Sequence, residues 1–327
     1  MGTNQNHCIA FLTPMAPETQ AVLKSLVPDG FEIIFAKSND QAERQQILAN
    51  AEYIFVSATD VDGDLIRSAP HLKMIQKWGV GVDRIDLQAA AEKGIAVAIT
   101  NGANAIPVAE HTVLLMLATL RKLPLAHNSL VQGQWITAKL RAMCFQLDGK
   151  TVGLFGFGNI AQAVAKRLAG FNVRILYYSR NPVSSALERD LGVTWVDLDT
   201  LLTQSDILSL HATLNSESKH IINAQALEKM KASAILINTS RGDLVDELAL
   251  IQALQNGLLR GAGLDTFSIE PLNKDHPLLH MDQVVVTPHS GAGVFEVVAK
   301  IGEHAMSNMQ RFENGLPLDP ADIILMP

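Results

Sequence analysis

A short glycine pattern constrains the fold of this chain more than any other part of its sequence. Residues 151–155 form an apolar run of strand type. Gly156, Gly158 and Ala161 follow it with the spacing G-x-G-x-x-A, and residues 162–168 continue with helical periodicity. A strand, a tight turn and a helix in this order are typical of a turn that binds the pyrophosphate of a dinucleotide, because the helix N-terminus offers N–H groups to the phosphates. The pattern alone also fits a glycine-rich turn that binds no ligand.

Short apolar runs recur along the chain and alternate with helical stretches. We expect buried strands at residues 8–12, 31–36, 53–57, 74–78, 95–99, 151–155, 173–177, 194–196, 207–210, 234–238, 261–264 and 284–287. We expect helices at residues 17–26, 40–49, 62–69, 86–93 and 294–312, before a proline-containing tail at 315–327. Strands that are apolar on both faces and alternate with helices predict parallel sheets covered on both sides. The two series predict two open α/β sheets.

A long apolar helix begins shortly after residue 102. We expect Pro107 near its start and Arg121 near its end. The helix carries Glu110 and His111 and is apolar on nearly every side after Thr112, so we expect it to be buried all round, between lobes or in a subunit interface. For His111, a capping or core role is favoured over a role as a ligand.

Composition excludes several classes of protein. The chain has 327 residues, of which 48% are apolar and 18% charged, which describes a globular protein of about two domains. A net charge of −7 argues against a nucleic-acid partner. Cys8 and Cys144 are too few for a disulfide framework or a zinc site, so we expect a reducing compartment and no metal. Because we find no signal peptide and no membrane-spanning run, we expect a cytoplasmic protein without a membrane partner.

Most polar residues that could carry chemistry follow strands of the second series. Ligands of an open parallel sheet bind beyond the carboxyl ends of its strands, so these residues should lie at one edge. They are Gly156, Gly158, Asn159, Tyr178, Ser179, Arg180, His211, Arg241, Asp265 and His289. Their shared edge favours a ligand site over a purely structural turn.

Three residues suggest a reaction at this edge. Arg241 carries a permanent planar charge that can bind a carboxylate with two hydrogen bonds. His289 can gain or lose a proton near neutral pH and can therefore act as a general acid or base. We place Glu270 beside His289, because a carboxylate favours the imidazolium and orients the ring. Taken singly, each also fits an ordinary role as a surface ion pair, a satisfied histidine or a solvated glutamate.

From about residue 78 to residue 291 the sequence resembles the D-isomer-specific 2-hydroxyacid dehydrogenases, the family of glyoxylate/hydroxypyruvate reductases and D-3-phosphoglycerate dehydrogenase. The resemblance rests on the blocks KWGVGVDRID, NGANAIPVAEH, TVGLFGFGNIA, ILINTSRGDLVDE, GAGLDTFSIEP and VVVTPHSGAG, in this order. It implies an α/β protein with a Rossmann-type doubly wound parallel sheet, a second, discontinuous flavodoxin-like domain and a cleft between them. Residues 1–101 and 291–327 would form the substrate domain and residues 102–290 the dinucleotide-binding domain. A homodimer would be built on the helix of residues 107–121.

The resemblance also implies roles for individual residues. Arg241, Glu270 and His289 would be the catalytic residues of hydride transfer from NAD(P)H to a small 2-oxo acid. The substrate would contact Arg241, His289 and the backbone N–H groups of Val80 and Gly81. The expected cofactor contacts are Gly156, Gly158, Asn159, Ile160, Tyr178, Ser179, Arg180, His211, Ala212, Thr213, Ser218, Thr239, Ser240, Arg241, Asp265, His289 and Gly291.

The residues after the second strand of the nucleotide domain predict which dinucleotide binds. About 20 residues past the glycine turn, NAD-binding folds place an acidic residue on the ribose hydroxyls. This chain has Tyr178 there, followed by Ser179 and Arg180. No carboxylate repels a 2′-phosphate, and Arg180 can pair with one, so we expect NADP to be preferred, with NAD as the alternative.

Other positions depart from the family's pattern or depend on it. Asp265 would lie near the nicotinamide and help to position it. Where the family has His-x-Pro, this chain has His211, Ala212 and Thr213, which leaves the shape of that loop open. Ala161 replaces the third glycine, which the fingerprint tolerates.

The loop after residues 53–57 bears on the substrate. It carries Asp60, Asp62 and Asp64, whose negative charges disfavour a phosphorylated substrate, although Lys77 and Arg84 are close in sequence. We also expect no C-terminal regulatory domain. Glyoxylate, hydroxypyruvate or a similar small 2-oxo acid is therefore favoured over D-3-phosphoglycerate.

Two further readings remain open. A dehydrogenase of formate or phosphite type is disfavoured, because formate oxidation needs no proton relay and Glu270 suggests one. A nucleotide-sensing binding protein, like the transcriptional corepressors that share this fold, could keep the same residues without turnover. The acidic net charge argues against that second reading.

Overall fold

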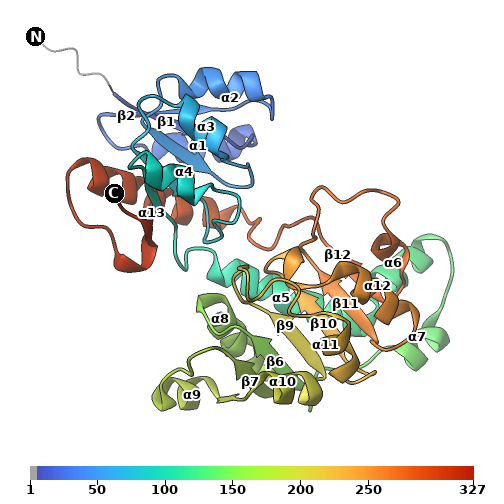
Figure 1. Cartoon of the computed structure of the whole chain (residues 1–327). Helices are drawn as coiled ribbons and strands as arrows, with labels where there is room; N and C mark the ends of the chain where they lie inside the picture. Colours follow the sequence, from blue (N-terminus) through green and yellow to red (C-terminus); the bar gives the residue numbers. More distant parts are fainter. Residues whose placement is uncertain (1–5) are drawn as a thin grey trace, which may run out of the picture. The chain divides into compact units, whose positions relative to one another are not determined.

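A computed structural model describes residues 6–327 and divides the chain into two compact units, each with its own sheet (Figure 1). One unit combines the residues up to Asn104 with Val294–Pro327, and the other is Ala105–Gly293. These boundaries fall a few residues after the ones we expected at residues 101 and 290. Among the described residues, no helix is both long and apolar enough to cross a membrane.

The discontinuous unit contains a six-stranded sheet in the order β2-β1-β3-β4-β5-β13. Its strands are β1 (His7–Phe11), β2 (Phe31–Phe35), β3 (Tyr53–Val56), β4 (Met74–Lys77), β5 (Ala96–Ala98) and β13 (Ile323–Leu325). The first five are parallel, and their order is that of flavodoxin-like sheets. We expected no strand in the tail, but β13 pairs antiparallel with β5. This short apolar run lies in a proline-containing tail, and the pairing with β5 makes it a strand.

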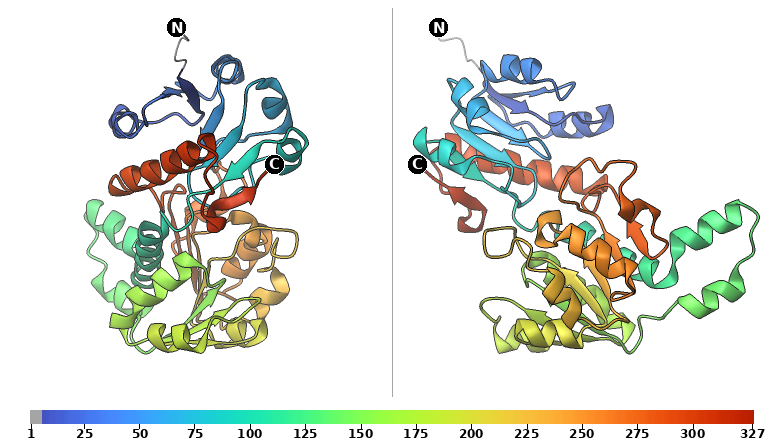
Figure 2. Two further views of the ribbon diagram at one scale, coloured as in Figure 1. Left: turned by 90° about the vertical axis from the view of Figure 1, so that its left-hand side faces the viewer. Right: turned by 45° about the vertical axis from the view of Figure 1, so that its right-hand side comes forward.

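Helices cover both faces of this sheet. They are α1 (Pro17–Ser25), α2 (Gln41–Leu48), α3 (Gly63–Ser68), α4 (Leu87–Glu92) and α13 (Glu296–Glu313). Alternate residues of β1 face opposite sides: Ile9 packs with Leu23 of α1 and Ile301 of α13, whereas Ala10 packs with Leu48 of α2. Helix α13, near the end of the chain, thus lies against strands from its beginning (Figure 2).

A polar cluster ties the end of α13 to this sheet. Nζ of Lys73 lies 2.5 Å from Glu52 and 3.0 Å from Glu313, and His7 lies 3.0 Å from Glu52. Burial opposes ionisation of Glu313, but hydrogen bonds from Tyr53 and Lys73 outweigh it and lower the pKa of this carboxyl. Within residues 6–327, His7, Glu52 and Glu313 are the one group close enough to hold a metal ion. Because the Lys73 ammonium lies between both carboxylates and pairs with each, the cluster is an ion-pair network.

The second unit contains a seven-stranded, fully parallel sheet in the order β8-β7-β6-β9-β10-β11-β12. Its strands are β6 (Thr151–Phe155), β7 (Arg174–Tyr178), β8 (Val193–Trp195), β9 (Ile207–Leu210), β10 (Ile235–Asn238), β11 (Gly261–Leu264) and β12 (Val284–Val286). Counted from β6, the order is 3-2-1-4-5-6 with one more strand, so the Rossmann-type prediction is confirmed. The order reverses between β6 and β9, which is where such sheets bind ligands.

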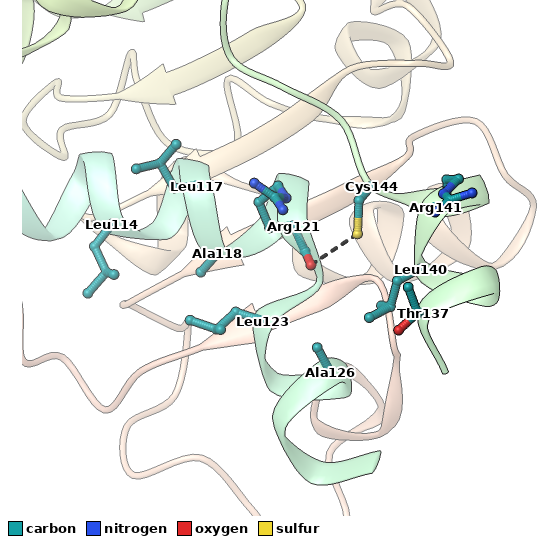
Figure 3. A pocket seen from close by; sticks show the side chains of 10 residues that line it. All are labelled: Leu114, Leu117, Ala118, Arg121, Leu123, Ala126, Thr137, Leu140, Arg141 and Cys144. Atoms are coloured by element: carbon teal, nitrogen blue, oxygen red, sulfur yellow. Dashed lines mark hydrogen bonds between the residues drawn. The ribbon is translucent and has the colours of Figure 1, made fainter. Parts of the chain in front are cut away.

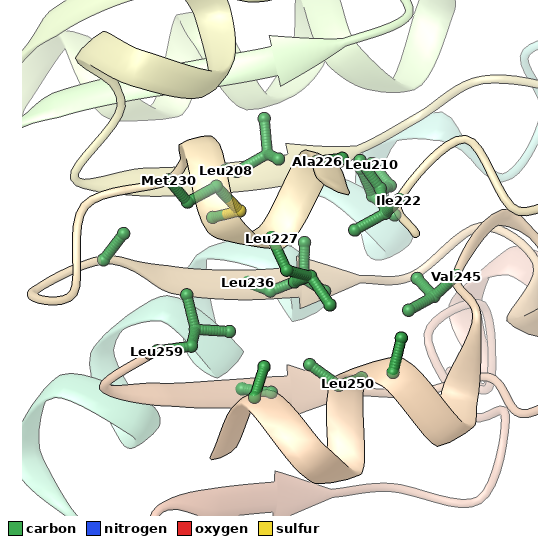
Figure 4. Close-up of a cluster of buried hydrophobic side chains, with 14 of the residues drawn as sticks. Leu208, Leu210, Ile222, Ala226, Leu227, Met230, Leu236, Val245, Leu250 and Leu259 are labelled. Carbon is green, nitrogen blue, oxygen red and sulfur yellow. The ribbon is translucent and has the colours of Figure 1, made fainter. Parts of the chain in front are cut away.

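Helices also cover both faces of the seven-stranded sheet. They are α5 (Ala105–Arg121), α6 (Leu123–Val131), α7 (Thr137–Met143), α8 (Asn159–Leu168), α9 (Ser185–Leu191), α10 (Leu198–Gln204), α11 (Ala224–Lys229) and α12 (Glu247–Gln255). On one face, α11 and α12 pack Leu227 and Leu250 against Leu208 and Leu236 of the strands (Figure 4). Helices α5 and α8 belong to the cluster on the other face.

Two features of residues 105–143 differ from our expectations. Helix α5 is not buried all round, because Leu114 is 51% exposed. It ends at Arg121 as expected, and Lys122 then adopts a left-handed conformation before α6 begins. We did not predict α6 and α7, which extend away from the seven-stranded sheet (Figure 2). Helix α7 has no buried residue, so its apolar side chains find little to pack against within the described chain.

Candidate active site

The glycine turn directly follows β6. Gly156 has a φ of +89°, and a Cβ built on it would lie 2.6–2.8 Å from backbone atoms of His211 and Ala212. Only glycine fits there, because the conformation is left-handed and the next loop lies too close for a side chain. A Cβ on Gly158, by contrast, would meet no protein atom within 4 Å. The packing of the protein gives no reason for glycine at 158, which fits a position where a ligand approaches the backbone.

Helix α8 starts immediately after this turn. Its N-cap is Gly158, which has no side chain to cap the first turn. Ala161 is fully buried on the face of α8 that packs against the sheet, so the small residue allows helix and strand to lie close together. A helix N-terminus with a glycine N-cap and a partial positive charge suits a bound phosphate. The turn and α8 therefore fit the pyrophosphate of a dinucleotide.

The loop after β7 carries the residues that we expect at the ribose. Tyr178 ends β7, and its ring stacks on Phe155 with a centroid distance of 5.7 Å. The Trp195 indole donates a hydrogen bond of 3.1 Å to the carbonyl oxygen of Ser179. Arg180 extends into solvent and lies 3.6 Å from Glu217. The loop is thus held by its backbone and presents a cationic side chain.

The loop after β9 passes over the glycine turn. His211 accepts or donates one hydrogen bond, between Nε2 and the Ser209 hydroxyl, at 2.9 Å. Protein atoms crowd its ring although the residue is partly exposed, and this burial lowers the pKa of His211 to about 3. His211 is therefore neutral near pH 7. Further along, Ser218 donates a 2.8 Å hydrogen bond to the carbonyl of Thr213, which closes the loop on itself.

The loop after β10 holds Arg241. The buried side chain of Asn238 donates to the carbonyl oxygen of Arg241 at 2.8 Å and accepts from the Ser240 N–H at 3.0 Å. Ser240 also donates to the carbonyl of Ala212, 2.6 Å away. A Cβ on Gly242 would lie 1.9 Å from the carbonyl carbon of Phe267. This close approach joins the Arg241 loop to the segment that leads to Glu270.

Glu270 and His289 form a hydrogen bond. Nδ1 of His289 lies 2.8 Å from Oε2 of Glu270, and Oε1 of Glu270 accepts from the Phe267 N–H at 3.1 Å. The side chain of His289 is 45% exposed and that of Glu270 is 19% exposed. His289 adopts a left-handed conformation with φ of +52°. With Nδ1 directed at the carboxylate, Nε2 on the other side of the ring is available to a substrate.

Asp265 fixes the loop that carries His289. The carboxylate is 1% exposed and accepts hydrogen bonds from the Thr287 hydroxyl at 2.6 Å and from the N–H groups of Ser290 and Gly291 at 2.8 Å each. His111 lies 3.3 Å away. Burial opposes ionisation, but these hydrogen bonds outweigh it and lower the pKa of Asp265. An ionised Asp265 therefore grips the chain on both sides of His289.

Comparisons with known proteins identify the family. A family model described as D-isomer specific 2-hydroxyacid dehydrogenase, NAD binding domain, matches residues 113–291. The hydroxypyruvate reductase of Thermotoga maritima is 43% identical over 80% of this chain and 85% of its own length. The chain belongs to the D-isomer-specific 2-hydroxyacid dehydrogenase family. It is therefore a dehydrogenase with an NAD-binding domain.

Two further relatives show the breadth of this family of dehydrogenases. The D-3-phosphoglycerate dehydrogenase of Archaeoglobus fulgidus is 37% identical to this chain. The match covers 92% of this chain and 57% of that relative. The structure of NAD-dependent formate dehydrogenase from Staphylococcus aureus in complex with NAD has 31% identity and a TM-score of 0.87. The match covers 98% of this chain and 99% of the other. Both relatives share the family, and their activities differ.

The expected site residues of the dehydrogenase fall where six parallel strands end, except for two. Val80 and Gly81 follow β4 in the discontinuous unit, and their contact with substrate stays a prediction. Sequence reasoning missed what His111 does: its Nε2 lies 2.9 Å from the Thr287 hydroxyl, beside Asp265. No local pattern could reveal this contact, because His111 and Thr287 are 176 positions apart in the chain.

Proposed function

We propose that this dehydrogenase reduces a small 2-oxo acid, such as glyoxylate or hydroxypyruvate, to the D-2-hydroxy acid with NADPH. The observation that carries the proposal is the 2.8 Å contact between His289 and Glu270, beside the loop of Arg241 and at the sheet edge of the glycine turn. A histidine paired with a carboxylate suits proton transfer to a carbonyl oxygen, and a guanidinium suits binding of a carboxylate.

In the proposed mechanism the bound nicotinamide supplies the hydride. Arg241 binds the substrate carboxylate, together with the N–H groups of Val80 and Gly81. The Arg241 guanidinium also stabilises the negative charge that develops on the substrate's carbonyl oxygen. Protonated His289 delivers the proton from Nε2, and Glu270 stabilises the imidazolium and orients the ring. Asp265 holds the loop of His289 in place while the proton moves.

The choice of a small, unphosphorylated substrate rests on the charges after β3. Asp62 caps α3 by accepting from the Leu65 N–H at 2.8 Å, and Asp64 pairs with Arg67 at 2.6 Å. Arg84 lies 3.9 Å from Asp60 and donates to the carbonyl of Ala58 at 2.9 Å. The acidic residues of this loop therefore act partly in local structure, and so does Arg84, which follows β4. Nothing in the loop favours a phosphate, so the unphosphorylated acids remain our proposal and D-3-phosphoglycerate the alternative.

Assays of nucleotide oxidation against a panel of acids test the substrate. We expect turnover with glyoxylate and hydroxypyruvate, and little with 3-phosphohydroxypyruvate. Formate oxidation, assayed with the oxidised cofactor, should be absent, because Glu270 supports a proton relay that formate does not need. A preference for the phosphorylated acid would replace the proposal with its alternative. Failure on every acid, with the dinucleotide still bound, would favour a nucleotide-sensing protein.

The same assays run with both reduced cofactors test the cofactor. No carboxylate lies in the segment from Tyr178 to Asn181 to repel a 2′-phosphate, and Arg180 can pair with one. We expect kcat/KM to be higher with NADPH than with NADH, by about tenfold or more if Arg180 binds the phosphate with two hydrogen bonds. A preference for NADH would contradict the assignment.

We also propose that the protein forms a homodimer through α5, α6 and α7. Leu114, Leu130 and Trp135 are exposed, with Trp135 at 82%. A groove of about 600 Å³ lies between α5, α6 and α7 and is lined mainly by apolar side chains such as Leu117, Leu123 and Leu140 (Figure 3). Exposed apolar patches of this kind mark interfaces, and a second copy of the same helices would cover them.

Sedimentation equilibrium tests the dimer. The wild-type protein should sediment at twice the chain mass, and Leu130→Glu should shift it to the monomer, because a buried charge at an apolar interface is costly. Leu316→Glu, at an exposed leucine near the end of the chain, is the matched control and should stay dimeric. A monomeric wild type would end the proposal.

A further inference from the structure

An ion pair joins the two loops that flank the glycine turn. In the seven-stranded sheet β6 lies between β7 and β9, so the loops after β7 and β9 lie on either side of Gly156. Nη1 of Arg180, after β7, is 3.6 Å from Oε2 of Glu217, after β9. Strands are about 4.8 Å apart, so two strands that flank a third are about 10 Å apart. The ion pair therefore spans the width of the turn that we assign to the pyrophosphate.

Both partners extend from backbone that is held in place. The Trp195 indole fixes the carbonyl of Ser179, next to Arg180, as described above. Oδ1 of Asn215 accepts from the N–H of Glu217 at 2.9 Å and from that of Ser218 at 3.0 Å, which forms a tight turn. The side chains of Arg180 and Glu217 are 77% and 75% exposed. The loops are preformed, and the two exposed side chains can exchange partners at little cost.

We propose that Glu217 determines cofactor specificity by competing with the 2′-phosphate of NADPH for Arg180. This inference rests on the proposed function, which places the dinucleotide at the glycine turn. A phosphate monoester carries a charge of about −1.5 to −2 near pH 7, so it displaces a single carboxylate from the guanidinium. NADH lacks this group and leaves the ion pair intact. Glu217 then stays close to the bound phosphate, and its repulsion weakens NADPH binding.

Removing the charge of Glu217 should therefore favour NADPH. We expect Glu217→Gln to tighten NADPH binding by about three- to tenfold, the scale of an exposed ion pair plus a screened repulsion. NADH binding should change by less than about twofold, because NADH carries no phosphate at this position. The gain for NADPH should shrink as salt is added, since the Debye length falls to about 8 Å at 0.15 M ionic strength.

Arg180 provides a test of the coupling. Arg180→Ala should weaken NADPH binding and should remove most of the response to Glu217→Gln, because the two residues act through the same contact. Glu228→Gln is the matched control: Glu228 is an exposed glutamate of the same unit, on α11, and its removal should change both affinities by less than about twofold.

The experiment is a titration of wild type, the three single variants and the Arg180/Glu217 double variant with NADPH and with NADH, followed by nicotinamide fluorescence without substrate. A selective gain for NADPH in Glu217→Gln, lost in the double variant, supports the proposal. If Glu217→Gln leaves the NADPH affinity unchanged, or raises the NADH affinity equally, the proposed role of Glu217 is wrong. The proposed function is not affected by this outcome. If the wild type binds neither dinucleotide, the proposed function fails and this inference with it.

Discussion

The His289→Ala variant is expected to bind the dinucleotide normally and to lose almost all turnover of 2-oxo acids. A positioned general acid contributes about 10²–10⁴-fold to a rate, so kcat should fall by a factor in this range. The contact of 2.8 Å between Nδ1 and Glu270 leaves Nε2 for the substrate oxygen. Alanine removes the proton donor and leaves the glycine turn and α8 untouched. Arg241→Ala should lose most turnover as well, because the carboxylate of the substrate then has no guanidinium to bind.

The measurements that check this expectation are kcat with glyoxylate and with hydroxypyruvate, and the dissociation constant of NADPH. His280→Ala, at an exposed histidine of the same unit, is the control and should keep wild-type turnover. Arg241→Lys keeps the charge but not the planar pair of donors, so it should recover only part of the activity. Unchanged turnover in either alanine variant would show that the replaced residue is not catalytic.

The sheet edge of the candidate site could be predicted because its signals are local. A strand buried on both faces needs an apolar run, and the polar residue that ends the run must lie at the carboxyl edge of a parallel sheet. This reasoning placed His211, Arg241, Asp265 and His289 after β9, β10, β11 and β12. It also placed the glycine turn after β6, where the geometry at Gly156 requires glycine.

Most features that sequence reasoning missed depend on partners far away in the sequence. Strand β13 is defined by its pairing with β5, more than 200 positions earlier in the sequence. Helix α7 has no buried residue, so no stripe of core residues predicts it from the sequence. The contact between His111 and Thr287 joins a helix to a loop of the far strand β12. For β13 and for His111 the local sequence allows several outcomes, and a tertiary contact selects one.

Asp265→Asn is expected to lower both the stability of the Ala105–Gly293 unit and the turnover. The carboxylate accepts hydrogen bonds from Thr287, Ser290 and Gly291. An asparagine has one acceptor oxygen in place of two. Its amide NH₂ group would lie next to a backbone N–H, and two donors cannot form a hydrogen bond with each other. Hydrogen bonds to charged groups contribute about 1.5–3 kcal/mol each, so we expect a loss of about 2–4 kcal/mol in the free energy of unfolding. Turnover should fall because the loop of His289 is no longer fixed.

The pH dependence distinguishes this role from a general packing defect. Folding lowers the pKa of Asp265, so its contribution to stability is complete above the unfolded value of about 3.9 and disappears as pH falls through the folded value. Urea denaturation should therefore show a constant difference between wild type and Asp265→Asn from about pH 5 to 8, and a shrinking difference below about pH 4. Asp282→Asn, at an exposed aspartate just before β12, is the control. A difference that does not change with pH would mean that the charge of Asp265 does not hold the loop.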